Sequence, residues 1–107
     1  MMITTTDLSR DEIIRSLRKL EPRLRARGIS RLAIFGSRAR GNHRPESDLD
    51  VLVDIKPGAK FSLIDLVGVS HIISDELGLP ANMFIRRSLE AGLAATIRSE
   101  IIEIFND

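Results

Sequence analysis

The stretch IFGSRARGNHRPESDLDVLVD, residues 34–54, decides the fold that the whole chain can adopt. It begins as an apolar run, breaks at a Gly-Ser pair, passes three arginines and ends in a second apolar run. Within residues 48–55, aspartates at positions 48, 50 and 54 alternate with apolar side chains. A period of two is typical of a β-strand. The stretch therefore predicts two strands joined by a cationic turn, the second strand having one acidic and one buried face.

Helical and strand patterns alternate along the rest of the chain. Ser9 and Glu12 have the spacing of a capping box, and Pro22 should kink or split the helix that they open, because proline lacks an N–H. The expected elements are a helix ending near Gly28, a strand over 31–36, a short helix after it, a strand over 48–55, a helix from Ser62 to Gly78, a strand over 81–85 and a final helix from Ser88 through Phe105. This order predicts an α/β (α+β) fold, with a small mixed β-sheet of about three strands covered by helices.

The composition is that of one folded domain. The chain has 107 residues, 43% hydrophobic and 29% charged, so we expect residues 1–107 to form a single domain. There is no cysteine, which excludes disulfides and thiolate metal sites. No apolar run approaches the roughly 20 residues of a membrane helix, and the first residues do not resemble a signal peptide. We therefore expect a cytoplasmic protein without a membrane partner.

Asp48 and Asp50 lie two residues apart on the predicted strand, so their side chains project from the same face, roughly 6.6 Å apart along the chain. Two carboxylates this close repel each other unless a cation lies between them. Oxygen ligands of this kind suit Mg²⁺ or Mn²⁺ together with substrate phosphates. The alternative interpretation is a pair of aspartates that simply face water at a strand end.

The preceding turn favours the metal site over that alternative. Gly36 lets the backbone turn tightly and approach a ligand, and Ser37 offers a hydroxyl and an N–H at the start of a short helix. Arg38 and Arg40 add positive charge. A strand, a phosphate-binding turn and a carboxylate pair together meet the needs of phosphoryl or nucleotidyl transfer.

The residues GSRARGNHRPESDLDVLV resemble the G-S…D-x-D signature of the nucleotidyltransferase superfamily that includes DNA polymerase β. The short chain, LAIFGSRARG before the signature and the helix in PGAKFSLIDLVGV after it, resemble the minimal nucleotidyltransferases, small prokaryotic proteins often paired with a HEPN-domain toxin. The resemblance spans roughly residues 10–104. It implies a mixed-sheet nucleotidyltransferase core.

The resemblance also implies roles for individual residues. Gly36 and Ser37 would contact the phosphates of ATP or another nucleoside triphosphate, with Arg40 as a further phosphate contact. Asp48 and Asp50 would be the catalytic carboxylates that ligate two Mg²⁺ ions, with Mn²⁺ as the alternative ion. The implied reaction is transfer of AMP to a hydroxyl of the partner HEPN toxin, which makes the protein an antitoxin.

One position departs from the family's pattern. The family has a third carboxylate on the next strand, and ANMFIRRSL aligns Asn82 with it. An amide can offer an oxygen to a metal, but it is neutral and accepts no proton. Asp54 lies roughly 13 Å along the strand from Asp50, too far to replace it. No convincing replacement comes from the remaining acidic candidates, which are Asp75, Glu76 and Glu90.

Asn82 leaves two functions open: an enzyme with a weakened site, or an inactive nucleotidyltransferase-like protein that binds and masks its partner. A third hypothesis, a nucleic-acid-binding module, rests on charge, because residues 1–44 hold eleven Lys/Arg and four Asp/Glu, whereas residues 45–107 hold five and eleven. Tyr and Trp are absent and no reading motif is present, so nucleic acid is not an expected partner. The sequence leaves the oligomeric state open.

Overall fold

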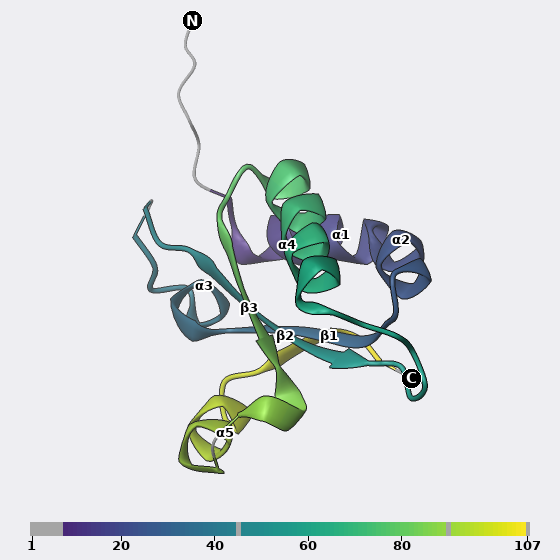
Figure 1. The fold of residues 1–107 in the computed structure, drawn as a ribbon. Coiled ribbons are helices and arrows are strands. Elements are labelled where there is room, and N and C mark those ends of the chain that lie inside the picture. The colour runs from purple at the N-terminus through teal and green to yellow at the C-terminus, as the bar shows by residue number, and fades with distance from the viewer. Residues whose placement is uncertain (1–7, 45, 90, 107) are drawn as a thin grey trace, which may run out of the picture.

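The computed structural model describes residues 8–44, 46–89 and 91–106, which form a four-stranded sheet with helices on both faces (Figure 1). The elements in chain order are α1 (Arg10–Lys19), α2 (Glu21–Ala26), β1 (Ile29–Phe35), α3 (Gly36–Arg40), β2 (Leu49–Ile55), α4 (Leu63–Leu77), β3 (Ala81–Ile85), the 3-10 helix η1 (Arg86–Ser88), α5 (Ala91–Arg98) and β4 (Ile102–Phe105). The expected α/β class and the mixed sheet are confirmed.

Local signals in the sequence set the helix ends. The Ser9 hydroxyl accepts a hydrogen bond from the Glu12 N–H at 3.1 Å, and a Glu12 carboxylate oxygen accepts one from the Ser9 N–H at 2.9 Å. Pro22 lies in the first turn of α2, and the chain divides at Leu20 into α1 and α2, as expected. These interactions satisfy N–H groups that a helix start leaves unpaired.

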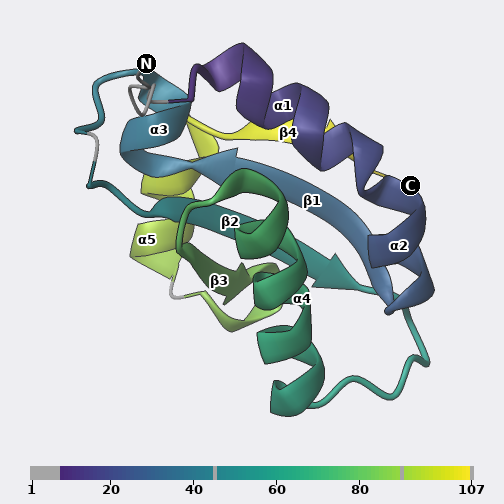
Figure 2. The same cartoon turned by 90° about the horizontal axis from the view of Figure 1, so that it is seen from above.

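The sheet has the strand order β3-β2-β1-β4 (Figure 2). β1 runs antiparallel to β2 and to β4, whereas β2 and β3 are parallel. The connection between the parallel strands is α4, which crosses one face of the sheet. The register places Phe35 opposite Asp50, and Asp50 opposite Asn82. Three neighbouring strands therefore bring the predicted site residues to one edge of the sheet.

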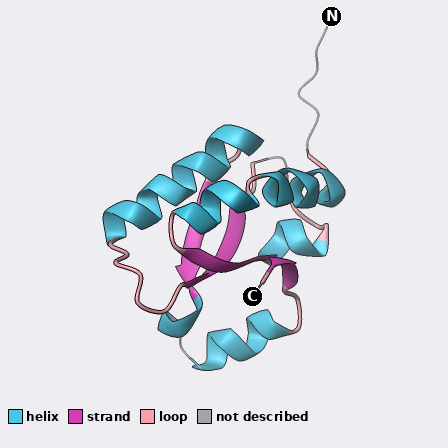
Figure 3. Cartoon of the chain, turned by 90° about the vertical axis from the view of Figure 1, so that its right-hand side faces the viewer, coloured by secondary structure: helices cyan, strands magenta, loops and turns pink. Residues whose placement is uncertain are grey.

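The alternation predicted for β2 is confirmed by burial on its two faces. Leu49, Val51 and Val53 are fully buried in the larger core cluster, together with residues of α1, α2 and α4. Leu52, on the opposite face, packs with Ala33, Phe35 and the α5 residue Ile97. Figures 1 and 3 show the sheet between these helical layers. β2 is thus covered on both faces, and this packing fixes the position of Asp50 near the start of the strand.

The expected final helix from Ser88 through Phe105 is wrong in extent. Ser88 lies in η1, α5 ends at Arg98, and residues 102–105 form a fourth strand, so the sheet has four strands and not about three. The apolar residues of this segment fit a helical repeat, but as a strand they also pair with the otherwise open edge of β1. Ile104 and Phe105 are buried there. No helix in the described part of the chain is long and apolar enough to span a membrane.

Candidate active site

The candidate site lies where β1 ends and where β2 and β3 begin. Gly36 directly follows β1, Asp50 is the second residue of β2, and Asp48 lies in the loop just before β2. Asn82 stands beside Asp50 on the parallel strand β3. Strands are about 4.8 Å apart in a sheet, so side chains on one face at matching positions meet. The structure therefore brings together the Gly-Ser turn, both aspartates and the departing position Asn82.

Asn82 connects the two aspartates directly. Its side-chain Nδ2 donates to Asp48 Oδ2 and to Asp50 Oδ1, each at 3.3 Å. The partial positive charge of the NH₂ group offsets the repulsion between the two carboxylates. The amide thus does electrostatically, and weakly, what a cation between these carboxylates would do.

This donor set fits a divalent cation only in part. Asp48 and Asp50 supply two carboxylates, which is as many as Mg²⁺ commonly takes from a protein. Asn82 would have to rotate its amide by half a turn to offer its oxygen. Among the residues that the structure describes, no three His, Cys, Asp or Glu side chains are grouped closely enough to hold a metal. Asp48 and Asp50 would hold the ion, with a neutral ligand where the family has a charged one.

Gly36 brings the backbone against Asp50. Its φ is +78°, a conformation that L side chains rarely adopt, and a Cβ added there would collide with Asp50 Oδ2. Ser37 follows in the first turn of α3, and its carbonyl accepts hydrogen bonds from the Gly41 and Asn42 N–H groups at 2.9 and 3.1 Å. The tight turn predicted at Gly36 is therefore present, and it leaves no room for a side chain beside the carboxylate.

Arg38 and Arg40 differ completely in their surroundings. Arg38 is fully buried, and its Nε donates to the Ser47 carbonyl at 2.8 Å, which ties α3 to the loop before Asp48. Arg40 is exposed, and its Nη1 contacts both carboxylate oxygens of Glu100 at 3.0 Å. Of the two guanidinium groups expected to add charge to the turn, only that of Arg40 is placed to meet a ligand.

Glu100 was not expected at the site from the sequence. It follows α5, and its N–H donates to the Ile97 carbonyl at 2.9 Å. The β1–β4 register pairs Ile34 with Ile102. Glu100 precedes Ile102 by two residues, and because the strands are antiparallel it lies beside the end of β1. No sequence signal indicated this position, because the segment fits the helical repeat that was expected to continue through it.

The environment of Asp50 raises the pKa of its carboxyl group. Burial is the largest cause, because it disfavours the charged form, and the negative charges of Asp48 and Glu100 act in the same direction. The Asn82 hydrogen bond and the positive charge of Arg40 oppose the rise. Asp50 is therefore held as a partly desolvated carboxylate whose charge is not fully neutralised by the protein.

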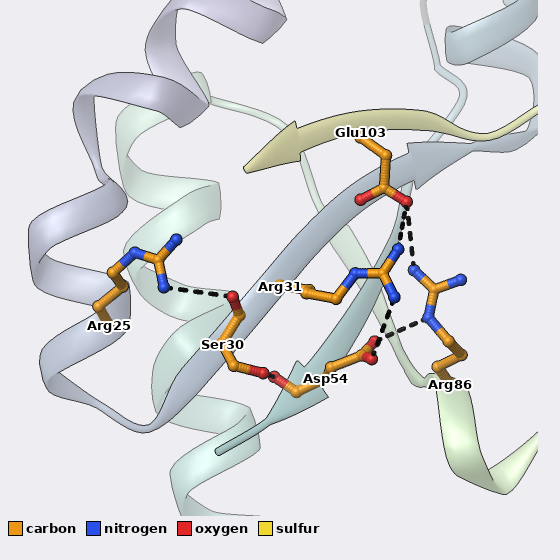
Figure 4. A network of polar contacts seen from close by, with 6 residues as sticks. All are labelled: Arg25, Ser30, Arg31, Asp54, Arg86 and Glu103. Carbon is orange, nitrogen blue, oxygen red and sulfur yellow. Dashed lines mark hydrogen bonds and ion pairs between the residues drawn. The ribbon is translucent and has the colours of Figure 1, made fainter. Parts of the chain in front are cut away.

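The described acidic residues that were considered as replacements lie elsewhere in the fold. Asp54 forms a network with Arg31, Arg86 and Glu103, in which the Arg86–Asp54 and Arg31–Glu103 contacts are 2.8 Å (Figure 4). Asp75 is exposed on α4, and Glu76 pairs with Lys19 at 2.8 Å. Glu90 lies outside the described residues. As expected, none of the described candidates is placed to replace the third carboxylate.

A mixed sheet whose edge presents a Gly-Ser turn against two carboxylates defines the nucleotidyltransferase class of core. A sequence model of the nucleotidyltransferase domain matches residues 11–105, and the chain belongs to this family. It is similar to the protein adenylyltransferase MntA of Thermococcus cleftensis, with 31% identity over 98 residues that cover 91% of this chain and 97% of that protein. A provisionally named protein adenylyltransferase of Methanocaldococcus jannaschii is 33% identical over 87 residues, which cover 81% of this chain and 91% of that protein.

Solved structures have the same fold. A chain provisionally described as a minimal nucleotidyltransferase has a TM-score of 0.73 and 29% identity, over 92% of this chain and 98% of that one. The Shewanella oneidensis complex of a tri-AMPylated HEPN toxin with its MNT antitoxin has a TM-score of 0.65 at 15% identity, over 92% of this chain and 73% of that one, which shows the fold alone. The chain is an MNT-type nucleotidyltransferase.

Proposed function

We propose that this chain transfers AMP from ATP, or the nucleotide of another nucleoside triphosphate, to a hydroxyl of a partner HEPN toxin, and so acts as an antitoxin that requires Mg²⁺. The observation that carries the proposal is the close approach of the Gly36 backbone to Asp50, with Asp48 held on the same edge by Asn82. The names of the relatives support a protein acceptor, because they are called protein adenylyltransferases.

In the proposed reaction the acceptor oxygen attacks the α-phosphorus of ATP. The bond from that phosphorus to the oxygen bridging the β-phosphate breaks, pyrophosphate leaves, and the hydroxyl proton passes to water. Magnesium, when bound by Asp48 and Asp50, would polarise the α-phosphate and stabilise the leaving oxygen. The N–H groups of the Gly36–Ser37 turn and the Arg40 guanidinium would hold the remaining phosphates. Asn82 takes no proton in this scheme.

An apolar surface along α4 suits a protein acceptor. Leu63, Ile64 and Val67 on α4 are 75%, 83% and 46% exposed. Val67 also lines a cavity of about 360 Å³ between α4 and β3, whose walls include Asn82. Exposed apolar groups gathered on one surface are typical of protein contacts. We call these residues the α4 surface; a toxin seated on it would extend past Val67 to the cavity beside Asn82.

Masking of the partner without chemistry is the second candidate function, and Asn82 favours it. The amide leaves the site with two carboxylates, so metal binding is weaker than with three. A masking protein needs the α4 surface but neither aspartate. The two functions therefore differ in what the loss of a carboxylate does to the partner's neutralisation.

Label transfer tests the proposal. The purified cognate toxin is incubated with α-labelled ATP, Mg²⁺ and either the native protein or Asp48→Asn. We expect labelled toxin with the native protein and at least about a 100-fold loss with the variant, because a metal ligand stabilises transition-state charge by several kcal/mol. The matched control Asp75→Asn removes an exposed carboxylate of α4 and should transfer normally. No transfer by the native protein, with Mg²⁺ or Mn²⁺, would overturn the proposal.

A further inference from the structure

We propose that Glu100 is a positioning residue for the nucleotide: it holds the Arg40 guanidinium at the edge of the site with two of its nitrogens left for phosphate oxygens. The inference rests on the proposed nucleotide-binding role of the same site and extends it to a residue 60 positions away from Arg40 in the sequence.

The contact with Glu100 uses only part of the Arg40 guanidinium. Arg40 uses a single nitrogen, Nη1, for both oxygens of Glu100, each at 3.0 Å. Its Nε and Nη2 make no hydrogen bond within the part of the chain that the structure describes. A guanidinium presents five N–H donors in a fixed plane, so anchoring one end fixes the direction of the others. Arg40 can therefore bind Glu100 and a phosphate at the same time.

Glu100 is itself firmly placed. Its backbone N–H is hydrogen-bonded to the Ile97 carbonyl, and the strand that follows it pairs with β1. Its side chain is 23% exposed, whereas that of Arg40 is 43% exposed. The carboxylate is therefore the fixed member of the pair, and the long arginine side chain is the member whose freedom it removes.

The pair also lies within the electrostatic environment of Asp50. Arg40 lowers and Glu100 raises the pKa of that carboxyl group, so both charges act on it. Without Glu100, Arg40 would be free to turn toward Asp50, and a guanidinium drawn to that carboxylate would compete with the metal and the phosphates. The contact with Glu100 holds Arg40 against this alternative.

Stability alone does not explain such a pair. Exposed ion pairs contribute little to folding, because water screens the charges and two long side chains lose freedom. Orienting a guanidinium for a charged ligand has a larger effect, because charge-assisted hydrogen bonds to phosphate are among the strong ones. The expected effect of Glu100 is therefore on ligand affinity and not on the fold.

The test measures binding of α,β-methylene-ATP with Mg²⁺ by calorimetry. We expect Glu100→Gln to weaken binding about 3- to 10-fold and Arg40→Gln to weaken it about 10-fold or more, in line with charge-assisted contacts to phosphate. The double variant should bind no more weakly than Arg40→Gln alone. In steady-state transfer, Glu100→Gln should raise KM for ATP and leave kcat nearly unchanged.

The control is Glu103→Gln, which makes the same acid-to-amide change on β4 but pairs with Arg31 and Arg86 away from the site. It should bind the analogue like the native protein. Unchanged or tighter binding by Glu100→Gln would overturn the inference. So would an equal weakening in the Arg40→Gln background, because that result would show a structural role for Glu100. Absence of AMP transfer with the analogue still bound would count against the proposed function and leave this inference standing; no analogue binding by the native protein would overturn both.

Discussion

Asn82 stands beside Asp50 on the neighbouring parallel strand, and its amide nitrogen lies 3.3 Å from Asp50 Oδ1. The same nitrogen is 3.3 Å from Asp48 Oδ2. This neutral amide has two effects on the site: it adds no negative charge, and its NH₂ group relieves the repulsion between the two carboxylates.

The change Asn82→Asp should reverse both effects. Three carboxylates attract a divalent ion more strongly, so we expect Mn²⁺ to bind about 10-fold or more tightly, in keeping with the energies of close charge pairs. Without metal, the added repulsion should lower the melting temperature. Calorimetric titration with Mn²⁺ and thermal unfolding in EDTA check these two results. Equal Mn²⁺ affinity in both proteins would mean that Asn82 does not face the metal.

Loss of the Asp50 charge should stabilise the metal-free protein. A raised pKa means that the folded state binds the proton more tightly than the unfolded chain does. The ionised carboxylate therefore destabilises the fold above the folded-state pKa, and this effect disappears as the pH falls below the unfolded pKa. We expect Asp50→Asn to melt at a higher temperature than the native protein at neutral pH in EDTA, with the difference shrinking in the acidic range. A lower melting temperature of the variant at neutral pH would contradict the cause assigned to the shift.

Gly36→Ala should damage both the fold and the site. The new methyl group would collide with Asp50 Oδ2, and the positive φ disfavours any L side chain. We expect a loss of about 1–3 kcal/mol in unfolding free energy, together with weaker nucleotide binding. Gly92→Ala is the control, because a Cβ there meets nothing within 4 Å and alanine favours a helix. Denaturant unfolding of both variants should show opposite signs; a neutral effect of Gly36→Ala would contradict the described approach of the turn.

The α4 surface should matter for the partner and not for the nucleotide. Ile64 is 83% exposed, so Ile64→Asp leaves the core intact and places a charge on an apolar contact. We expect toxin binding to weaken at least about 10-fold, because a buried unpaired charge is costly, and analogue binding to stay unchanged. Ala95→Asp introduces the same charge at an exposed residue of α5, on the other face of the sheet, and should bind the toxin normally. Equal toxin affinity in all three proteins would place the contact elsewhere.

Local patterns in the sequence were enough to predict most elements up to β3. The capping box at Ser9, the split before α2 and the alternation of β2 depend on neighbouring residues, and all are present. The alignment of Asn82 with the family's third carboxylate came from the resemblance, and the β2–β3 register places Asn82 opposite Asp50. β4 was not predicted, because a short apolar segment fits the spacing of a helix as well as that of a strand. Only the pairing with the open edge of β1 decides for the strand.

Part of the site also depends on contacts between segments far apart in the sequence, so local patterns could not predict it. Glu100 reaches Arg40 only because β4 returns to β1, a contact between residues 60 positions apart. The difference between Arg38 and Arg40 was equally hidden, because both are arginines of one short helix and only the packing around Ser47 turns the first inward.

The intact mass of the partner toxin tests the central claim most directly. The toxin is produced together with either the native protein or Asp50→Asn, separated from it under denaturing conditions and weighed by mass spectrometry. The account predicts toxin carrying one or more AMP groups when made with the native protein, and unmodified toxin when made with the variant. Unmodified toxin from both preparations, neutralised equally well by both proteins, would contradict it and establish masking as the function.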